Sequence, residues 1–432
     1  MELTSWGRHP RIAASSSSFE TEGELLRTLE KGGDIIARGL GRSYGDSALN
    51  SNVISTARFN KILAFDPSNG LVVCESGVTL AELIEIFLKR GWFLSITPGT
   101  RLITVGGAIA SDVHGKNHHT AGCFSECVEW FELMLPDKSI VRCSREENRE
   151  LFLATCGGMG LTGIILTAAI RLKRVNSAYI RETVIRCNNL SEIFHLFDVY
   201  QATTYSVAWI DCAASGKRLG RSVLMAGEHA EAGKLNIPLP RTLSVPFDLP
   251  SFCLNKYSVS IFNRLYFNTS PSHIKDRLVL LEPFFYPLDK IGNWNRIYGK
   301  KGFTQYQPVI PRESAYEALK EILNRIAKQG LGSFLAVLKL FGPENENFIS
   351  FPMGGYTLAL DFKIEPRLFP FLDELDRIVI DFGGRVYLTK DVRMSKEVFR
   401  KGYPGWEQFA EIREKYKMKG KFESLQSKRL EV

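Results

Sequence analysis

The fold of this chain is decided by a glycine-rich segment near its N-terminus, Ala37-Arg-Gly-Leu-Gly-Arg-Ser-Tyr-Gly-Asp46, which directly follows a β-rich run. Glycines allow successive backbone N–H groups to turn toward one point, and converging donors of this kind bind a pyrophosphate. The pattern therefore indicates a phosphate-binding turn.

Other interpretations of this segment exist. It does not match a Rossmann fingerprint, because the third glycine, Gly45, falls one residue late and no helical pattern follows. It does match the G-x-S-x-G nucleophile elbow, with Ser43 as the nucleophile, although residues 46–50 are turn-forming where a helix must begin. A Ser43 hydrolase and a plain glycine turn therefore stay open as alternatives.

A second stretch of small residues runs from Thr97 to Gly115 and contains Thr104-Val-Gly-Gly-Ala-Ile-Ala-Ser-Asp-Val-His-Gly115. Such backbone can lie against a flat, extended ligand, because glycine permits close approach. The polar contacts would come from Thr104, Ser111, Asp112 and His114. His114 is equally suited to a structural hydrogen bond.

A metal cluster has to be considered just after this stretch. The candidate ligands are Asn117, His118, His119, Cys123 and Cys127. Their spacing fits no zinc pattern, so we expect no metal.

A third glycine segment, Gly158-Met-Gly-Leu-Thr-Gly163, has the residue pattern GxGxxG but lacks the strand-then-helix context of that motif. A helical pattern precedes it and a strand follows, so no helix N-terminus faces a phosphate and tight packing explains the glycines better. The surrounding residues 151–170 carry no charge and approach the length of a membrane span. The glycines favour a helix end, a buried loop and a strand over residues 164–170 instead.

Length and composition indicate a two-domain enzyme. The chain has 432 residues, of which 44% are hydrophobic and 24% charged. Its net charge of +8 would suit a phosphorylated ligand or an anionic membrane surface. We expect no nucleic-acid partner, because the densest basic run, residues 413–429, has the pattern of a solvated helix face.

The cysteines and the N-terminus indicate a reducing, cytoplasmic location. Eight cysteines are scattered without a framework spacing, so most are expected to be buried thiols. Residues 1–18 lack the apolar segment of a signal peptide.

The distribution of periodic segments predicts an α+β fold. Residues 34–38 and 71–74 are expected strands, and Thr79 and Glu82 form a capping box that starts a helix over residues 79–89. Later segments predict helices at 312–328 and 368–382, strands at 334–341 and 356–362, and a helical C-terminus from residue 406. The proline-rich stretch from Pro238 to Pro250 is either a surface connection or a flap over a site.

These segments together resemble the flavoprotein family whose PCMH-type FAD domain is shared with vanillyl-alcohol oxidase and with the alditol and aldonolactone oxidases. Within it, the similarity is strongest to the oxidase subunits of decaprenylphosphoryl-ribose 2-epimerases. Two motifs carry most of the resemblance, Arg38-Gly-Leu-Gly-Arg-Ser-Tyr-Gly-Asp46 and His114-Gly-Lys-Asn-His-His119. It extends over residues 151–166, 294–298, 305–307, 334–342 and 383–393, and so spans nearly the whole chain.

The resemblance implies a two-subdomain FAD-binding domain over residues 1–175, a substrate domain with an antiparallel sheet over 176–384, and a C-terminal return to the first domain over 385–432. It implies that residues 37–46 hold the FAD diphosphate. These are Ala37, Arg38, Gly39, Leu40, Gly41, Arg42, Ser43, Tyr44, Gly45 and Asp46. The rest of the cofactor would be lined by Gly99, Thr104, Val105, Gly106, Gly107, Ser111, Asp112, Val113, His114, Gly115, Asn117, Ile165 and Tyr387.

The same resemblance implies catalytic and substrate residues. Lys390 would lie at the pyrimidine edge of the flavin and stabilise developing negative charge, while His114 and Tyr44 would orient the substrate or carry its proton. Gln307, Lys339 and Thr357, together with Lys390, match substrate positions, and Lys339 suits a phosphate. Covalent relatives carry histidine in a G-x-G-H-S turn where this chain has Arg42, so FAD should be dissociable.

The implied reaction is oxidation of the 2-hydroxyl of a polyprenyl-phosphoryl pentose, the first half of an epimerisation that a separate reductase completes, as in cell-wall arabinan synthesis. A peripheral membrane contact would suit such a substrate. Related sequences have asparagine and cysteine where this chain has Thr357 and Ala359, which leaves a soluble alditol or aldonolactone oxidase as the alternative.

Overall fold

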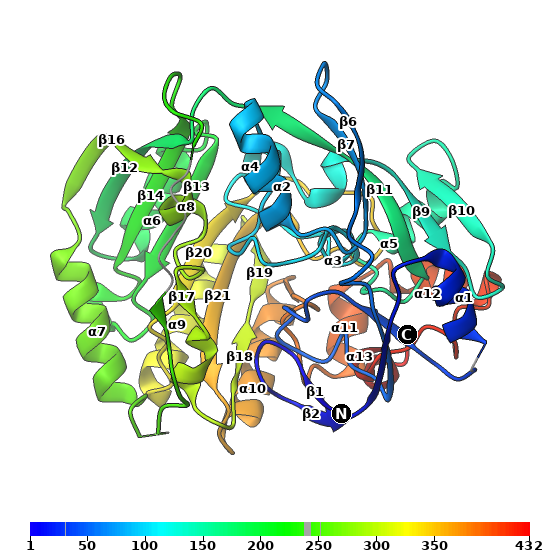
Figure 1. Cartoon of the computed structure of the whole chain (residues 1–432). Helices are drawn as coiled ribbons and strands as arrows, with labels where there is room; N and C mark the ends of the chain where they lie inside the picture. The colour runs from blue at the N-terminus through cyan, green and yellow to red at the C-terminus, as the bar shows by residue number, and fades with distance from the viewer. Residues whose placement is uncertain (31, 237–242, 251) are drawn as a thin grey trace.

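The computed structural model describes residues 1–30, 32–236, 243–250 and 252–432, and its strands form two main sheets that lie side by side (Figure 1). The N-terminal part combines a small parallel sheet with an antiparallel one, and the middle of the chain forms a large antiparallel sheet. The predicted α+β class and the antiparallel second sheet are confirmed.

The small sheet has three parallel strands in the order β3-β5-β4. Helix α1 (Glu22–Leu29) lies between β3 and β4 in sequence. The strands are β3 (Ser15–Ser18), β4 (Ile36–Arg38) and β5 (Asn52–Ser55). The glycine-rich segment leaves the end of β4, and no helix follows it up to Ser51, so the context of a nucleophile elbow is missing.

The second N-terminal sheet has six antiparallel strands in the order β10-β9-β11-β7-β6, with β8 also pairing β11. Its strands are β6 (Ile62–Asp66), β7 (Leu71–Glu75), β8 (Trp92–Leu94), β9 (Val128–Met134), β10 (Ile140–Ser144) and β11 (Ile164–Arg174). The helices of this part are α2 (Leu80–Phe87), α3 (Val105–Ala110), α4 (His118–Ala121) and α5 (Arg149–Thr155). The capping box of Thr79 and Glu82 starts α2 as predicted.

The uncharged stretch at 151–170 forms the end of α5, a glycine loop and then β11, as its glycines predicted. A Cβ atom on Gly158 would lie 2.0 Å from the carbonyl oxygen of Ala154, so this loop is glycine-rich because it packs tightly. In the described part of the chain, no helix has both the length and the apolar character that crossing a bilayer requires.

The large sheet has nine strands, all antiparallel, in the order β16-β12-β14-β13-β20-β21-β19-β22, with β18 also pairing β21. They are β12 (Tyr179–Cys187), β13 (Tyr205–Ile210), β14 (Ser222–His229), β16 (His273–Leu280), β18 (Phe303–Tyr306), β19 (Pro308–Pro311), β20 (Ala336–Phe341), β21 (Gly355–Lys363) and β22 (Arg385–Val386). The helices around it are α6 (Leu190–Val199), α7 (Lys256–Thr269), α8 (Leu281–Phe285), α9 (Ala315–Gln329) and α10 (Leu368–Asp381).

Alternation along the strands gives the large sheet two distinct faces. In β21, Leu358 and Leu360 pack into the main hydrophobic core with α9 and α10, so Thr357 and Asp361 point to the opposite face. In β20, Lys339 lies directly across from Thr357 and shares that face. This second face carries the polar residues discussed below.

After β22 the chain returns to the N-terminal sheets. Phe422 forms an isolated bridge with Ile35, and α11 (Lys396–Gly402), α12 (Trp406–Lys415) and α13 (Leu425–Leu430) complete the molecule. The interpretation of residues 413–429 as a solvated helix face is wrong for two of them. Arg413 is buried against Glu423, and Arg429 pairs with buried carboxylates. Both side chains therefore hold the C-terminal segment to the N-terminal part of the molecule.

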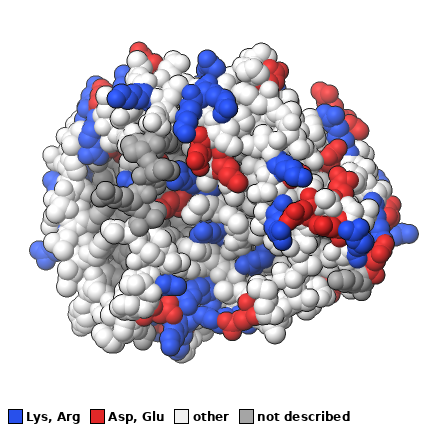
Figure 2. Space-filling model, viewed as in Figure 1, with Lys and Arg blue, Asp and Glu red and all other residues white. Residues whose placement is uncertain are grey.

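Two short ladders complete the strands. β1 (Glu2–Thr4) pairs with the next strand, β2 (Arg11–Ala13), and β15 (Leu243–Ser244) pairs with the more distant β17 (Ile291–Gly292). Of the proline-rich stretch, residues 238–242 lie outside the described residues. Seven of the cysteines are buried free thiols, as expected, and Cys253 is exposed. Figure 2 shows basic and acidic side chains interspersed on the face seen in Figure 1.

Candidate functional site

The fold brings the glycine-rich loop 39–46 against two segments that are distant in sequence. A Cβ atom on Gly39 would lie 2.2 Å from Oγ1 of Thr104, and one on Gly45 would lie 1.5 Å from the carbonyl oxygen of Asp391. Gly41 has a φ of +63°, which favours glycine. The loop is therefore pressed between the start of α3 and the turn after β22.

We expect Gly45→Ala to destabilise the fold by about 1–3 kcal/mol, because the added methyl group cannot avoid a main-chain oxygen. Thermal unfolding would measure the loss, and FAD retention after gel filtration would show whether the loop has moved. Gly99→Ala is the matched control, since nothing lies within 4 Å of a Cβ atom at Gly99. Equal stability of the two variants would contradict the packing argument.

Residues 105–110 of the small-residue stretch form helix α3. The Thr104 hydroxyl accepts a hydrogen bond from the N–H of Gly107 at 3.2 Å and caps the helix. A Cβ atom on Gly106 would lie 2.9 Å from Cβ of Ser76, so the helix sits close to the antiparallel sheet. Thr104 thus faces the glycine loop from the helix N-terminus, while Val105 is buried in the core and Gly106 and Gly107 form the first turn of the helix.

Residues 111–113 have structural contacts of their own. The Tyr387 hydroxyl donates to the carbonyl oxygen of Ser111 at 2.8 Å, which joins the turn after β22 to α3. The buried Asp112 carboxylate accepts hydrogen bonds from Asn345, Asn347 and Ser350 and from the N–H of Ser125. Asp112 therefore anchors the loop that follows β20, and its carboxylate is already satisfied.

His114 lies at the centre of a buried polar group on the second face of the large sheet. Its Nε2 is 3.0 Å from Nε2 of Gln307, and Gln307 donates to the hydroxyl of Thr357 at 3.2 Å. Rings of Phe341, Phe351, His118 and Tyr387 surround the imidazole. Burial holds the pKa of His114 well below its usual range, so the imidazole is neutral near pH 7.

Lys390 follows the turn at Tyr387 and extends over the ring of Tyr44, with its Nζ 3.8 Å from the ring centroid. Burial lowers the pKa of Lys390 to about 7, although Asp361 opposes the shift. Burial likewise raises the pKa of Asp361 to about 7, against a hydrogen bond from Gln305 at 2.6 Å and the charge of Lys390. Tyr44 stays neutral because burial raises its pKa well above the ordinary value.

Two further lysines approach the same region. Burial lowers the pKa of Lys339 to about 8 and that of Lys116 to about 7, and the charge of Lys339 contributes to the shift of Lys116 and of Lys390. Lys116 donates to the carbonyl oxygen of Phe284. The three lysines of this cluster outnumber the carboxylates that act on them, Asp361 on Lys390 and Glu182 on Lys116, so an anionic ligand would supply the missing negative charge.

The remaining predicted residues are placed as follows. Arg38 donates to the carbonyl oxygens of Thr4 and Ala48, and Arg42 stacks over the ring of Trp6 at 4.1 Å. Leu40 is largely exposed, and Ile165 is buried in β11. The amide of Asn117 donates to Ser95, and a Cβ on Gly115 would meet Asn117 Oδ1 at 2.6 Å. Val113 accepts from Phe124, and Ser43 from Trp6, through their main-chain oxygens.

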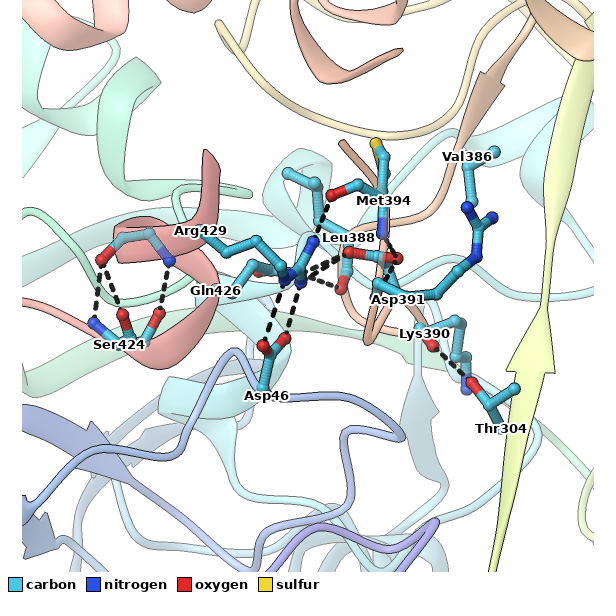
Figure 3. A network of polar contacts seen from close by, with 12 residues as sticks. Asp46, Thr304, Val386, Leu388, Lys390, Asp391, Met394, Ser424, Gln426 and Arg429 are labelled. Carbon is cyan, nitrogen blue, oxygen red and sulfur yellow. Dashed lines mark hydrogen bonds and ion pairs between the residues drawn. The ribbon is translucent and has the colours of Figure 1, made fainter. Parts of the chain in front are cut away.

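Sequence analysis missed Gln305, Asp361, Asp391, Arg429 and Lys116. Asp361 lies four positions after Thr357 in a strand, so the two-residue period would have placed it on the same face. Arg429 gave no local signal, because its partner Asp46 is 383 residues away. Figure 3 shows Arg429 of α13 between Asp46 and Asp391, and Lys390 on the far side of Asp391.

These residues fit an FAD molecule. The glycines let the loop pack closely on Thr104 at the start of α3 and on Asp391 in the turn after β22. The buried atoms Nδ1 of His114 and Oδ1 of Asn117 have no hydrogen-bond partner among the described residues, which leaves polar groups for a ligand. No set of three or more His, Cys, Asp or Glu side chains in the described ranges could hold a metal ion.

Comparison with known proteins supports the same cofactor. A family model described as an FAD binding domain matches residues 21–144. The chain is 38% identical to decaprenylphosphoryl-beta-D-ribose oxidase of Mycolicibacterium smegmatis, over 100% of this chain and 97% of the relative.

Two other relatives are more distant or shorter in overlap. L-gulono-1,4-lactone dehydrogenase of Mycobacterium tuberculosis is 21% identical over 94% of the chain and 92% of the relative. Delta(24)-sterol reductase of Homo sapiens is 33% identical, over 26% of the chain and 22% of the relative. The whole-length match covers both the glycine loop and the lysines of the large sheet.

Proposed function

The chain belongs to the FAD-dependent oxidoreductase family of decaprenylphosphoryl-beta-D-ribose oxidase, and from this we propose that it oxidises the 2-hydroxyl group of a polyprenyl-phosphoryl pentose. The observation that carries the proposal is the lysine cluster beside His114, Gln307 and Thr357 on one face of the large sheet. Cationic groups for a phosphate and hydrogen-bonding groups for a sugar meet there.

Bound FAD would supply the acceptor for the hydride that leaves the sugar carbon. In the proposed site, residues 37–46 and the start of α3 hold its diphosphate. Lys390 contributes positive charge where negative charge develops during the reaction. Because Gln307 donates to its Nε2, the neutral imidazole of His114 carries its proton on Nδ1 and can donate a hydrogen bond from there to an oxygen of the substrate, so His114 orients the sugar. Lys339 pairs with the substrate phosphate.

We further propose that FAD is bound without a covalent link. Arg42 occupies the turn position at which covalent relatives carry histidine, and its guanidinium stacks on Trp6. A guanidinium offers no nucleophilic nitrogen for such a link, since it stays protonated. Denaturation followed by filtration should therefore release all of the flavin.

A separate reductase would complete an epimerisation, because oxidation alone leaves a ketone that must be reduced on the other face. A peripheral membrane contact would give access to a lipid-linked substrate.

FAD affinity should weaken as the pH rises through about 7. Lys390 and Asp361 both have a pKa of about 7, so below this pH both are protonated and the pair carries one positive charge. As the pH rises, loss of the first proton leaves the pair neutral, wherever the remaining proton resides, and loss of the second leaves it negative. Because FAD is an anion, its dissociation constant should rise by up to about tenfold per pH unit above 7. Fluorescence titration of apoprotein would measure this.

Lys390→Met is the control for this titration. Without the lysine charge, Asp361 keeps its proton to higher pH, so the step near pH 7 should be absent. A step of unchanged size in the variant would assign it to other groups.

The proposed substrate is tested by mixing anaerobic protein with a short-chain polyprenyl-phosphoryl ribose, and separately with free alditols and aldonolactones, while flavin absorbance is followed. We expect bleaching with the phosphorylated substrate at micromolar concentrations. Bleaching by free polyols alone would overturn the proposal in favour of an alditol or aldonolactone oxidase. Hydrolysis of an ester that depends on Ser43 would instead support the hydrolase alternative.

A further inference from the structure

The outer surface of helix α7 carries apolar side chains that the rest of the described chain does not cover. Tyr257, Ile261 and Leu265 follow one another at every fourth position and are 69%, 61% and 59% exposed. Phe262 and Tyr266, which are 45% and 36% exposed, extend this stripe sideways and are partly covered by Phe334 and Trp209. We call these five residues the α7 surface. Most of the exposed large hydrophobic side chains of the described residues lie between 243 and 291, around this helix.

The other side of α7 is fully used in packing. Phe267 contacts Trp209 and Val223 of the large sheet, and Val259 and Asn263 are buried. A surface helix of a soluble protein normally turns a polar face to water. Since α7 is apolar on both sides, we expect its outer face to contact another apolar surface.

The α7 surface lies on the same face of the sheet as the candidate site. Trp209, against which α7 packs, is the strand partner of Val337, and Val337 and Lys339 share one face of β20. In Figure 1, α7 lies at the outer margin of this sheet.

Aromatic contacts connect the α7 surface to the candidate site. Ring centroids of Phe262 and Phe334 are 5.7 Å apart, and those of Phe334 and Tyr298 are also 5.7 Å apart. Tyr298 stacks on Phe303 at 4.2 Å, and Phe303 contacts Tyr44 at 5.3 Å. A continuous row of aromatic side chains therefore runs from the exposed helix α7 to Tyr44, the ring over which Lys390 lies.

The charges around α7 are mainly positive. Lys256, Arg264 and Lys275 are exposed, and none of them forms an ion pair with a carboxylate of the described residues. Of the acidic residues in the same region, Asp248 is paired with Arg8, and the exposed Asp276 follows Lys275 in the chain. The margin where α7 lies is covered mostly by uncharged side chains in Figure 2. Unpaired cations beside tyrosine and phenylalanine match the interface of an anionic membrane.

We propose that the α7 surface docks on an anionic lipid bilayer and so places the candidate site at the membrane, where a polyprenyl-phosphoryl substrate resides. The inference rests on the proposed function for the choice of partner, because a lipid-linked sugar must be reached without leaving the bilayer. The polyprenyl chain can then remain in lipid while its phosphate and sugar reach Lys339 and His114.

Flotation of the full-length, FAD-loaded protein with vesicles tests this proposal. Vesicles of phosphatidylcholine alone and vesicles containing one third phosphatidylglycerol would be compared. We expect binding to the anionic vesicles, and a loss of at least tenfold in the double variant I261E/L265E. Leu63→Glu is the matched control, since Leu63 is 52% exposed on a different sheet and should leave binding unchanged.

Substrate assays separate this proposal from the proposed function. The double variant should oxidise a short-chain, water-soluble polyprenyl-phosphoryl ribose at the wild-type rate and a vesicle-embedded long-chain substrate at least tenfold more slowly. Failure of every phosphorylated substrate, with vesicle binding still dependent on α7, would overturn the proposed function alone. Unchanged vesicle binding in the variant would overturn the docking proposal.

Sedimentation velocity would show whether the α7 surface instead binds a second copy of the chain. If the wild type does not bind vesicles but forms a dimer in sedimentation velocity that the double variant loses, the surface joins two copies of the chain and the bilayer proposal is overturned.

Discussion

Replacing Lys390 with methionine should slow anaerobic flavin reduction by about 10²–10³-fold at saturating substrate, which is the usual effect of removing one preorganised charge from a reacting centre. The methionine keeps the length of the side chain and its packing on Tyr44. Asp361 would not be stranded as a buried anion, because its pKa is already about 7 and rises further without the lysine charge. The variant should therefore fold and bind FAD, so that the limiting rate reports on chemistry.

Lys339→Met is the comparison for this variant. Lys339 is also a desolvated lysine, but we place it at the substrate phosphate, so its loss should raise the substrate concentration for half-maximal bleaching and leave the limiting rate within a few-fold. Removal of its charge should also raise the pKa of Lys390, since Lys339 now lowers it. A limiting rate in Lys390→Met equal to that of the wild type would contradict the assigned role.

Local patterns in the sequence predicted elements whose causes are also local. The helix after Thr79 forms because its capping box satisfies the first backbone N–H groups, and the strand at 355–363 forms where apolar residues alternate with polar ones. The glycines at 158–163 were assigned to packing because no helix follows them, and their close main-chain contacts confirm it.

Helix α3 shows where a local pattern was insufficient. Residues 105–110 contain two glycines, which disfavour a helix by their own propensity. The Thr104 cap and the close approach of Gly106 to Ser76 stabilise the helix, and the second of these is a tertiary contact. The composition of small residues indicated close approach of the backbone to a ligand, but it gave neither the helical conformation nor the contact with Ser76.

Much of the candidate site depends on contacts between distant segments. The motifs located the glycine loop, His114 and Lys390, and the resemblance added Gln307, Lys339 and Thr357. The hydrogen bond of Gln307 with His114 spans 193 residues, and no periodicity within either segment reports it. The direction in which Lys390 points likewise depends on Tyr44 and Asp361, which lie far away in the sequence.

The strongest structural effect is expected from Arg429→Leu. Arg429 lies 2.9 Å from a carboxylate oxygen of Asp46 and 2.9 Å from one of Asp391, and both carboxylates are buried (Figure 3). Removing their shared cation leaves the Asp46 carboxylate without an ion pair among the described residues and weakens the compensation of Asp391, which the charge of Arg393 still stabilises. The change should cost about 3–5 kcal/mol of unfolding free energy. Urea denaturation would measure it. Lys428→Leu on the same helix is the control, because its exposed ion pair with Asp34 should contribute less than about 1 kcal/mol.

The loss in Arg429→Leu should depend on pH in a direction that identifies its cause. Arg429 helps to hold the pKa of Asp391 below its ordinary value, so in the wild type this carboxylate contributes stability above its unfolded pKa and loses it as the pH falls through the folded one. In the variant, burial raises the pKa of both carboxylates and they accept protons earlier. The stability difference between the two proteins should therefore shrink toward pH 4, and a constant difference would point to lost packing instead. Gly45 of the glycine loop packs on the main chain of Asp391. Displacement of Asp391 in the variant should therefore also lower FAD affinity at least tenfold.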